Sequence, residues 1–84
     1  MATIYKTDGT EENIQPKNGK DFKLKELQPV VEGYIEIVRL RDGRLMIVNE
    51  EGMLMKLPYN RIASQIARQP IVGNVLVCDE GQIK

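Results

Sequence analysis

Residues 34–52 read YIEIVRLRDGRLMIVNEEG, in which two segments rich in β-branched residues flank Asp42-Gly43. Asp-Gly favours the positive φ angles of a two-residue type I′ turn, so this stretch predicts a β-hairpin. Pairing Arg41 with Arg44 across the turn sets the register of the two strands. The pairs on one face are then Leu40 with Leu45, Val38 with Ile47, Glu36 with Asn49 and Tyr34 with Glu51. Both faces are partly apolar, which predicts a hairpin covered on each side.

A second Asp-Gly dipeptide, at residues 8–9, predicts another two-residue hairpin turn between residues 2–7 and 10–15. In the matching register, Lys6 lies opposite Glu11 as a pair of opposite charges across the strands. The sequence predicts a third strand of the central meander at residues 53–57 and a final buried strand at residues 75–78.

Two short helices complete the prediction. Leu24, Leu27 and Val31 share one face at helical spacing, and Pro29 kinks this helix or limits it to about two turns. Its start is ambiguous: Asp21 can cap it, whereas Lys23 has no side-chain acceptor and would leave Glu26 without its capping-box partner. The second helix covers residues 61–68, with Asn60 as N-cap. We therefore expect one α+β domain over residues 1–84, with an antiparallel, mostly meander sheet of about five or six strands.

The composition narrows the function classes. The 84 residues contain twelve Lys plus Arg, twelve Asp plus Glu, no His and one Cys. A net charge of zero gives no overall attraction to nucleic acid or to an anionic membrane, and no apolar run approaches the length of a membrane helix. Without His, neither a Ser-His nor a Cys-His nucleophile pair can form, nor a zinc site of the usual kind. We therefore expect a protein that is not an enzyme and has no metal or cofactor. Since no leader opens the chain and a single Cys forms no internal disulfide, we also expect it to be cytoplasmic.

The predicted register gathers polar side chains at one end of a hairpin face. Tyr34, Glu36, Asn49 and Glu51 meet there, and burying such groups without partners would cost about 1–3 kcal/mol each. A bound ligand could satisfy them, and Asn60 is a further candidate member of this cluster. Alternatively, this end of the sheet reaches solvent, Glu36 and Asn49 brace the neighbouring turn, and Asn60 only caps its helix.

Positive charge gathers in two places. Lys17, Lys20, Lys23 and Lys25 lie near the start of the first helix, where they oppose the helix dipole, and Arg39 lies near the tip of the central hairpin. Lys20, Lys23 and Arg39 are therefore candidate anion contacts. The alternative is a solvated, lysine-rich loop. Similarly, Met46, Met53 and Met55 could form an adaptable contact surface or fill the core.

Four segments carry a resemblance to a known family: residues 33–38 (GYIEIV), 48–52 (VNEEG), 57–60 (LPYN, with Ala63 close behind) and 71–77 (IVGNVLV). Together they resemble the domain-of-unknown-function family number thirty-eight forty-six, short proteins carried by bacteriophages, mobile elements and gut bacteria. The likeness spans nearly the whole chain. Because the family name carries no assigned activity, the resemblance implies a setting, that of a phage or mobile-element accessory protein.

Two functions fit this setting. The first is a non-enzymatic protein that sequesters a small nucleotide-like ligand, as in anti-defence, through the Tyr34 cluster. Lys20, Lys23 or Arg39 would then neutralise phosphates, across a subunit interface if the chain forms a homo-oligomer. The second is a module that inhibits or adapts a host protein through its sheet face or its Met-rich third strand. An enzyme ranks third, because catalysis would have to rest on carboxylates, Lys or Tyr alone.

Overall fold

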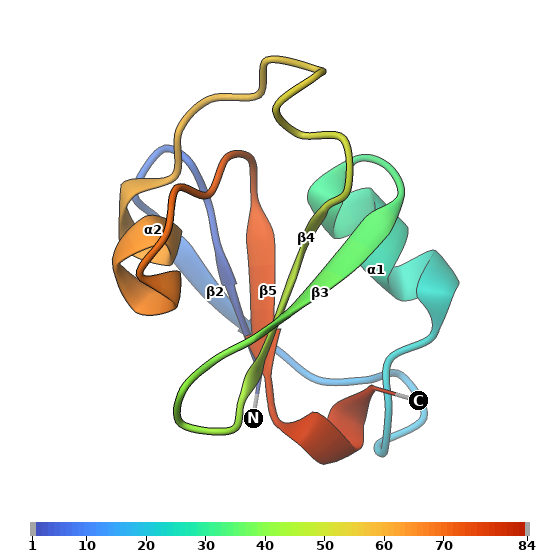
Figure 1. Cartoon of the computed structure of the whole chain (residues 1–84). Helices are drawn as coiled ribbons and strands as arrows, with labels where there is room; N and C mark the ends of the chain where they lie inside the picture. Colours follow the sequence, from blue (N-terminus) through green and yellow to red (C-terminus); the bar gives the residue numbers. More distant parts are fainter. Residues whose placement is uncertain (1, 84) are drawn as a thin grey trace.

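The computed structural model describes residues 2–83 and confirms the α+β class (Figure 1). Its elements are the strands β1 (Ala2–Tyr5), β2 (Glu11–Ile14), β3 (Ile35–Arg39), β4 (Leu45–Asn49) and β5 (Val75–Cys78), the helices α1 (Leu24–Val31) and α2 (Arg61–Ala67), and the 3-10 helix η1 (Glu80–Gln82). The strands form one antiparallel sheet in the order β2-β1-β5-β4-β3. The sheet therefore consists of two hairpins joined by β5, and β3 lies at one edge.

Each face of the sheet carries its own hydrophobic core. On one face Leu27 and Val31 of α1 pack against a cluster that contains Ile47 and Leu76. On the other face Ala63 of α2 belongs to a second cluster with strand residues of the opposite parity, such as Met46, Val48 and Val77. The two helices thus cover opposite faces of the sheet (Figure 1), and all five residues of β4 are buried, as the predicted double cover requires.

The predicted register of both hairpins is wrong by one residue. In the β3–β4 hairpin, Ile37 pairs with Ile47 and Glu36 pairs with Val48. The connection is a three-residue loop, because the Leu40 amide donates to the Arg44 carbonyl oxygen at 2.9 Å. In the β1–β2 hairpin, the Lys6 amide likewise donates to the carbonyl oxygen of Thr10 at 2.9 Å.

The physical reason is the conformation of the aspartate in each loop. A type I′ turn needs positive φ at both central residues, whereas here Gly43 (φ 91°) has it and Asp42 does not. The Asp42 Oδ1 atom instead accepts the Arg44 amide at 3.0 Å, and a type I turn followed by a left-handed glycine results. The extra loop residue turns every β3 side chain to the other face relative to β4.

The predicted pairing of Lys6 with Glu11 fails for the same reason. Tyr5 is the residue that pairs with Glu11. The Lys6 Nζ atom lies 3.6 Å from a carboxylate oxygen of Glu12, one residue further along the strand.

Helix α1 has Lys23 as its N-cap residue, and the carboxylate of Glu26 supplies the capping hydrogen bond. The Glu26 carboxylate accepts the Lys23 amide at 2.7 Å and the Lys17 amide at 3.0 Å, so its capping role does not depend on an acceptor side chain at Lys23. Asp21 instead accepts a hydrogen bond from the side-chain amide of Asn18. The helix has eight residues, about two turns, and Glu32 ends it in the left-handed conformation (φ 65°).

Residues 53–57 form a turn, and the prediction of a strand there is wrong. The position beside β4 that a meander strand would need is occupied by β5. The segment closes on itself instead: the Met55 amide donates to the Glu51 carbonyl oxygen at 2.9 Å, and the Leu57 amide donates to that of Gly52 at 3.1 Å.

The predictions for α2 and β5 are confirmed within a residue. Asn60 caps α2, and all four residues of β5 are buried. Among residues 2–83, no helix combines the length and the apolar character that crossing a membrane requires.

Candidate functional site

The predicted polar cluster does not assemble on one face of the sheet. With Glu36 paired to Val48, the Glu36 side chain lies on the α2 face, whereas Asn49 shares the α1 face with Ile47. Tyr34 is 66% exposed just before β3, and Glu51 is exposed beyond the end of β4. The common pocket that the wrong register implied is therefore not formed by these four residues, and a ligand-binding role for any one of them stays a prediction.

The side-chain amide of Asn49 is hydrogen-bonded to the main chain around it. Its Nδ2 atom donates to the Val31 carbonyl oxygen at 2.9 Å, and its Oδ1 atom accepts the Glu51 amide at 2.7 Å. Gly33 lies so close that a Cβ atom there would be 2.8 Å from Nδ2. Asn49 thus connects the end of α1 to the end of β4. This contact agrees with the alternative in which Asn49 braces the neighbouring turn and does not bind a ligand.

The side-chain amide of Asn60 is likewise hydrogen-bonded to the main chain. Its Oδ1 atom accepts the Ala63 amide at 3.1 Å, while its Nδ2 atom donates to the carbonyl oxygens of Tyr5 and Gly73, both at 2.9 Å. Only 1% of its surface is exposed, and it contributes to the lining of a cavity of about 210 Å³ beside Lys6 and Arg61. It caps α2 and fixes that helix to β1 and to the loop before β5.

The candidate anion contacts lie away from Glu36. Lys20 is exposed in the loop before α1, and the Nζ atom of Lys23 lies 3.4 Å from Asp21. Arg39 pairs with Glu80 at 3.4 Å, on the β3 face opposite to Glu36. The side chains of Lys20, Lys23 and Arg39 are all exposed, and none of the three lines the groove described next.

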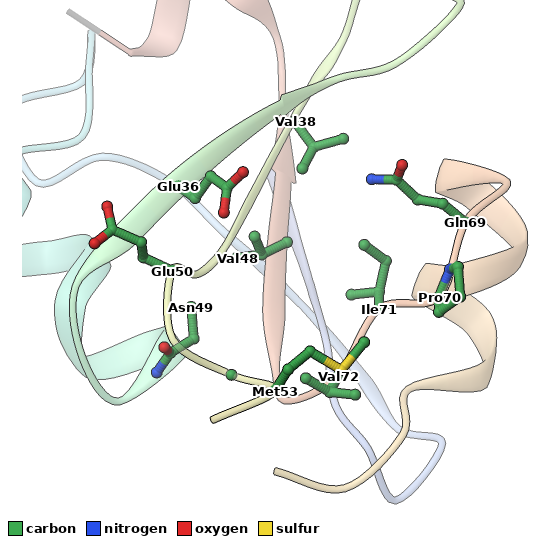
Figure 2. A pocket seen from close by; sticks show the side chains of 11 residues that line it. Glu36, Val38, Val48, Asn49, Glu50, Met53, Gln69, Pro70, Ile71 and Val72 are labelled. Atoms are coloured by element: carbon green, nitrogen blue, oxygen red, sulfur yellow. The ribbon is translucent and has the colours of Figure 1, made fainter. Parts of the chain in front are cut away.

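A groove of about 150 Å³ runs between the outer part of the sheet and the segment that follows α2 (Figure 2). Val38 and Val48 from the sheet and Ile71 from the segment supply its apolar surface. The remaining lining residues are Glu36, Asn49, Glu50, Gly52, Met53, Gln69, Pro70 and Val72. Glu36 and Glu50 lie on its sheet side, opposite Gln69, as Figure 2 shows.

The electrostatic character of the groove is acidic. No Lys or Arg is among its lining residues, and the side chains of Glu36 and Glu50 make neither a hydrogen bond nor an ion pair within residues 2–83. Two such carboxylates beside an apolar surface attract a cation and repel a phosphate. The groove is also smaller than the roughly 300–1,000 Å³ typical of small-molecule sites.

Exposed apolar side chains adjoin one end of this groove. Met53 is 64% exposed, Leu54 82% and Met55 49%, so the turn carries three consecutive exposed apolar residues, which we call the apolar turn. Met53 also lines the groove, which makes the two surfaces contiguous. The predicted Met-rich contact surface is in part present here, whereas Met46 is fully buried in the core.

Glu50, Val38 and Val48 were not predicted as groove residues, because the predicted register placed the β3 side chains on the wrong face relative to β4. No signal in the sequence distinguishes the two registers, because an Asp-Gly dipeptide is compatible with both a two-residue turn and the three-residue loop that both hairpins adopt. Among residues 2–83, no group of three or more His, Cys, Asp or Glu side chains is placed to hold a metal ion.

No curated protein and no solved structure matches the chain. The family model described as "Domain of unknown function (DUF3846)" matches residues 2–83. This is the family that the four sequence segments indicated, and the match covers almost the whole sequence. The chain therefore belongs to the DUF3846 family.

Proposed function

We propose that this chain is a non-enzymatic protein-binding module that contacts its partner through the apolar turn, Met53 to Met55. The observation that carries the proposal is the 82% exposure of Leu54, which lies between two methionines that are 64% and 49% exposed. Contiguous exposed apolar side chains are characteristic of surfaces that become buried on association. Methionine is well suited to such a surface because its flexible thioether adapts to the partner.

The apolar turn is held in place rather than loosely attached. Three main-chain hydrogen bonds close it, from the amides of Met55, Lys56 and Leu57. The Asn49 Nδ2 atom lies 3.6 Å from the Met55 sulfur, which fixes one side of the turn to the sheet. A preformed surface loses less conformational entropy on binding, so this order favours a docking role.

The nucleotide-like ligand receives less support. Such a ligand needs cations near its phosphates, yet the groove is lined by Glu36 and Glu50, whose carboxylates have no partner within residues 2–83, and the candidate cations lie elsewhere. In the phage or mobile-element setting that the resemblance implies, a protein-binding module would inhibit or adapt a host protein in the cytoplasm.

Site-specific photo-crosslinking tests the proposal. A photoreactive residue replaces Leu54 in one variant and Gln65, an exposed residue of α2, in the control. After irradiation in lysates of gut bacteria, the expected result is one defined protein adduct from position 54 that position 65 does not give. Leu54→Asp should compete poorly for that partner while retaining the melting temperature of the wild type, because the side chain is exposed.

The opposite results would reject the proposal. These are equal adducts from both positions, no adduct from position 54, or undiminished competition by Leu54→Asp. A melting temperature that rises with one member of a nucleotide panel would instead support the ligand-sequestering function.

A further inference from the structure

We propose that the edge strand β3 and the acidic groove beside it accept an extended segment of the partner protein as an added β-strand. The segment alternates cationic with apolar residues. This inference rests on the protein-binding function proposed above and names the chemistry of the partner.

The main chain of β3 is available for such pairing. The Glu50 amide donates to the Tyr34 carbonyl oxygen and the Leu40 amide donates to that of Arg44, each at 2.9 Å. Along an antiparallel pair of strands, every second residue directs its main-chain N–H and C=O groups toward the partner strand. Residues 34, 36, 38 and 40 therefore direct these groups toward β4. Ile35, Ile37 and Arg39 therefore direct theirs away from the sheet, and no strand among residues 2–83 pairs with that side.

The α2 face of β3 selects a cationic side chain. Glu36 projects from the edge strand, Glu50 follows the end of β4 on the same face, and both carboxylates lack a partner within residues 2–83. An Arg or Lys on an added strand would reach these carboxylates. Its aliphatic stem would cover Val38 and Val48, which belong to the apolar part of the groove.

The α1 face of β3 selects an apolar side chain. Ile37 is 44% exposed there, at the centre of the edge strand. Since neighbouring residues of a strand point to opposite faces, a segment that places cations over the groove places every other residue against Ile37. The recognised pattern is therefore a strict alternation of cationic and apolar residues.

The groove also links this strand site to the apolar turn. Met53 lines the groove and belongs to the apolar turn, so one partner can pair with β3 and cover Leu54 through a continuous surface. Main-chain pairing with an edge strand supplies affinity, and the flanking side chains supply specificity.

A second copy of this chain fits the edge less well. If two β3 strands pair antiparallel with all five residues matched, the two Glu36 side chains lie on one face about 7–8 Å apart, on the diagonal. Like charges in that arrangement repel, and neither copy brings a cation to the groove. A cationic segment of another protein satisfies the same carboxylates.

A displayed library of random nine-residue peptides tests the inference on the intact chain. Enriched peptides should alternate Lys or Arg with apolar residues, and their synthetic forms should slow amide hydrogen exchange at Ile35, Ile37 and Arg39. Glu36→Gln/Glu50→Gln should weaken their binding by roughly threefold to tenfold, as expected for two exposed charge pairs. The matched control is Glu11→Gln/Glu12→Gln, which removes the same charge from the other edge strand, β2, and should leave the affinity unchanged.

A peptide-side control separates strand addition from simple charge attraction. Methylating alternate main-chain nitrogens of an enriched peptide on the edge that would face β3 keeps its charge and should abolish binding. The inference is overturned if nothing is enriched, if the enriched peptides lack the alternation, or if the methylated peptide still binds. It is equally overturned if the chain itself dimerises and protects the same amides. The crosslink from position 54 is measured separately, so it can persist when strand addition fails.

Discussion

Asn49 joins three parts of the chain through one side-chain amide. It donates to Val31 and accepts from Glu51, and it is 6% exposed. Replacing it with Ala would leave a buried carbonyl oxygen and a main-chain amide without their partners, which costs about 1–3 kcal/mol. We therefore expect Asn49→Ala to lower the free energy of unfolding by about that amount, as measured by urea denaturation.

Glu36 provides the matched comparison for Asn49. Its carboxylate is exposed and has no partner within residues 2–83, so Glu36→Ala should change the free energy of unfolding by less than about 0.5 kcal/mol. Equal stability losses for the two variants, or none for Asn49→Ala, would contradict the structural role of Asn49.

Asp42 makes the stability of the central hairpin depend on acid pH. Hydrogen bonds from the main chain and side chain of Arg44 hold the pKa of Asp42 below its ordinary value of 3.8. The pKa of Asp42 is lower in the folded protein than in the unfolded protein. Its contribution to stability is therefore complete at pH values above the unfolded-state pKa and is lost as the pH falls through the folded-state pKa. Asp42→Asn should therefore flatten the dependence of unfolding free energy on pH below about pH 4.

The measurement is a series of urea denaturations across that acid range. Glu50→Gln serves as the control, because this carboxylate has no partner within residues 2–83. An unchanged slope for Asp42→Asn would show that the Arg44 contacts do not persist in solution.

At the scale of elements, the two hairpin loops share one geometry that depends on a left-handed glycine. Gly9 has φ 92° and Gly43 has φ 91°, and a Cβ atom at either position would meet no neighbouring atom within 4 Å. Any cost of Gly43→Ala is therefore conformational, and we expect a loss of about 1 kcal/mol. Gly81→Ala is the control, since its φ is not positive and its surroundings are also open. Thermal unfolding that ranks the two variants equally would argue against this loop.

Much of the element order could be predicted because local chemistry determines it. Asp-Gly between β-branched segments indicates a hairpin, and Asn60 before an amphipathic run indicates the start of α2. The loop length could not be read from the same residues. A two-residue turn needs positive φ at both Asp42 and Gly43, whereas the three-residue loop needs it at Gly43 only. The two conformations differ little in energy, and the sequence pattern does not distinguish them.

That single ambiguity explains why the candidate site was only partly predicted. A shift of one residue in the register reverses the face of every side chain in β3 relative to β4. Glu36 is thereby separated from Asn49 and lies near Glu50 instead. The turn at residues 53–57 was missed for a different reason, because its conformation depends on β5, which follows much later in the sequence.

At the scale of the whole molecule, the insertion of β5 between the two hairpins determines which strands remain open. It leaves β2 and β3 at the edges of the sheet. Strand β2 reads EENI and is mostly exposed and polar, which protects an edge against unwanted pairing. Strand β3 reads IEIVR, with apolar residues on both faces, and is the edge better suited to receive a partner strand.

The pairing of β3 with β4 determines the face on which Glu36 lies, and cross-strand Hα–Hα nuclear Overhauser effects measure this pairing directly. In the observed register, Ile37 and Ile47 form a pair without mutual hydrogen bonds, whose Cα atoms approach to about 4.5 Å. We predict a strong Hα–Hα effect between these two residues and another between Ile35 and Asn49. Strong effects between Val38 and Ile47 and between Glu36 and Asn49 would contradict the account, because they would place Glu36 beside Asn49 and remove it from the groove.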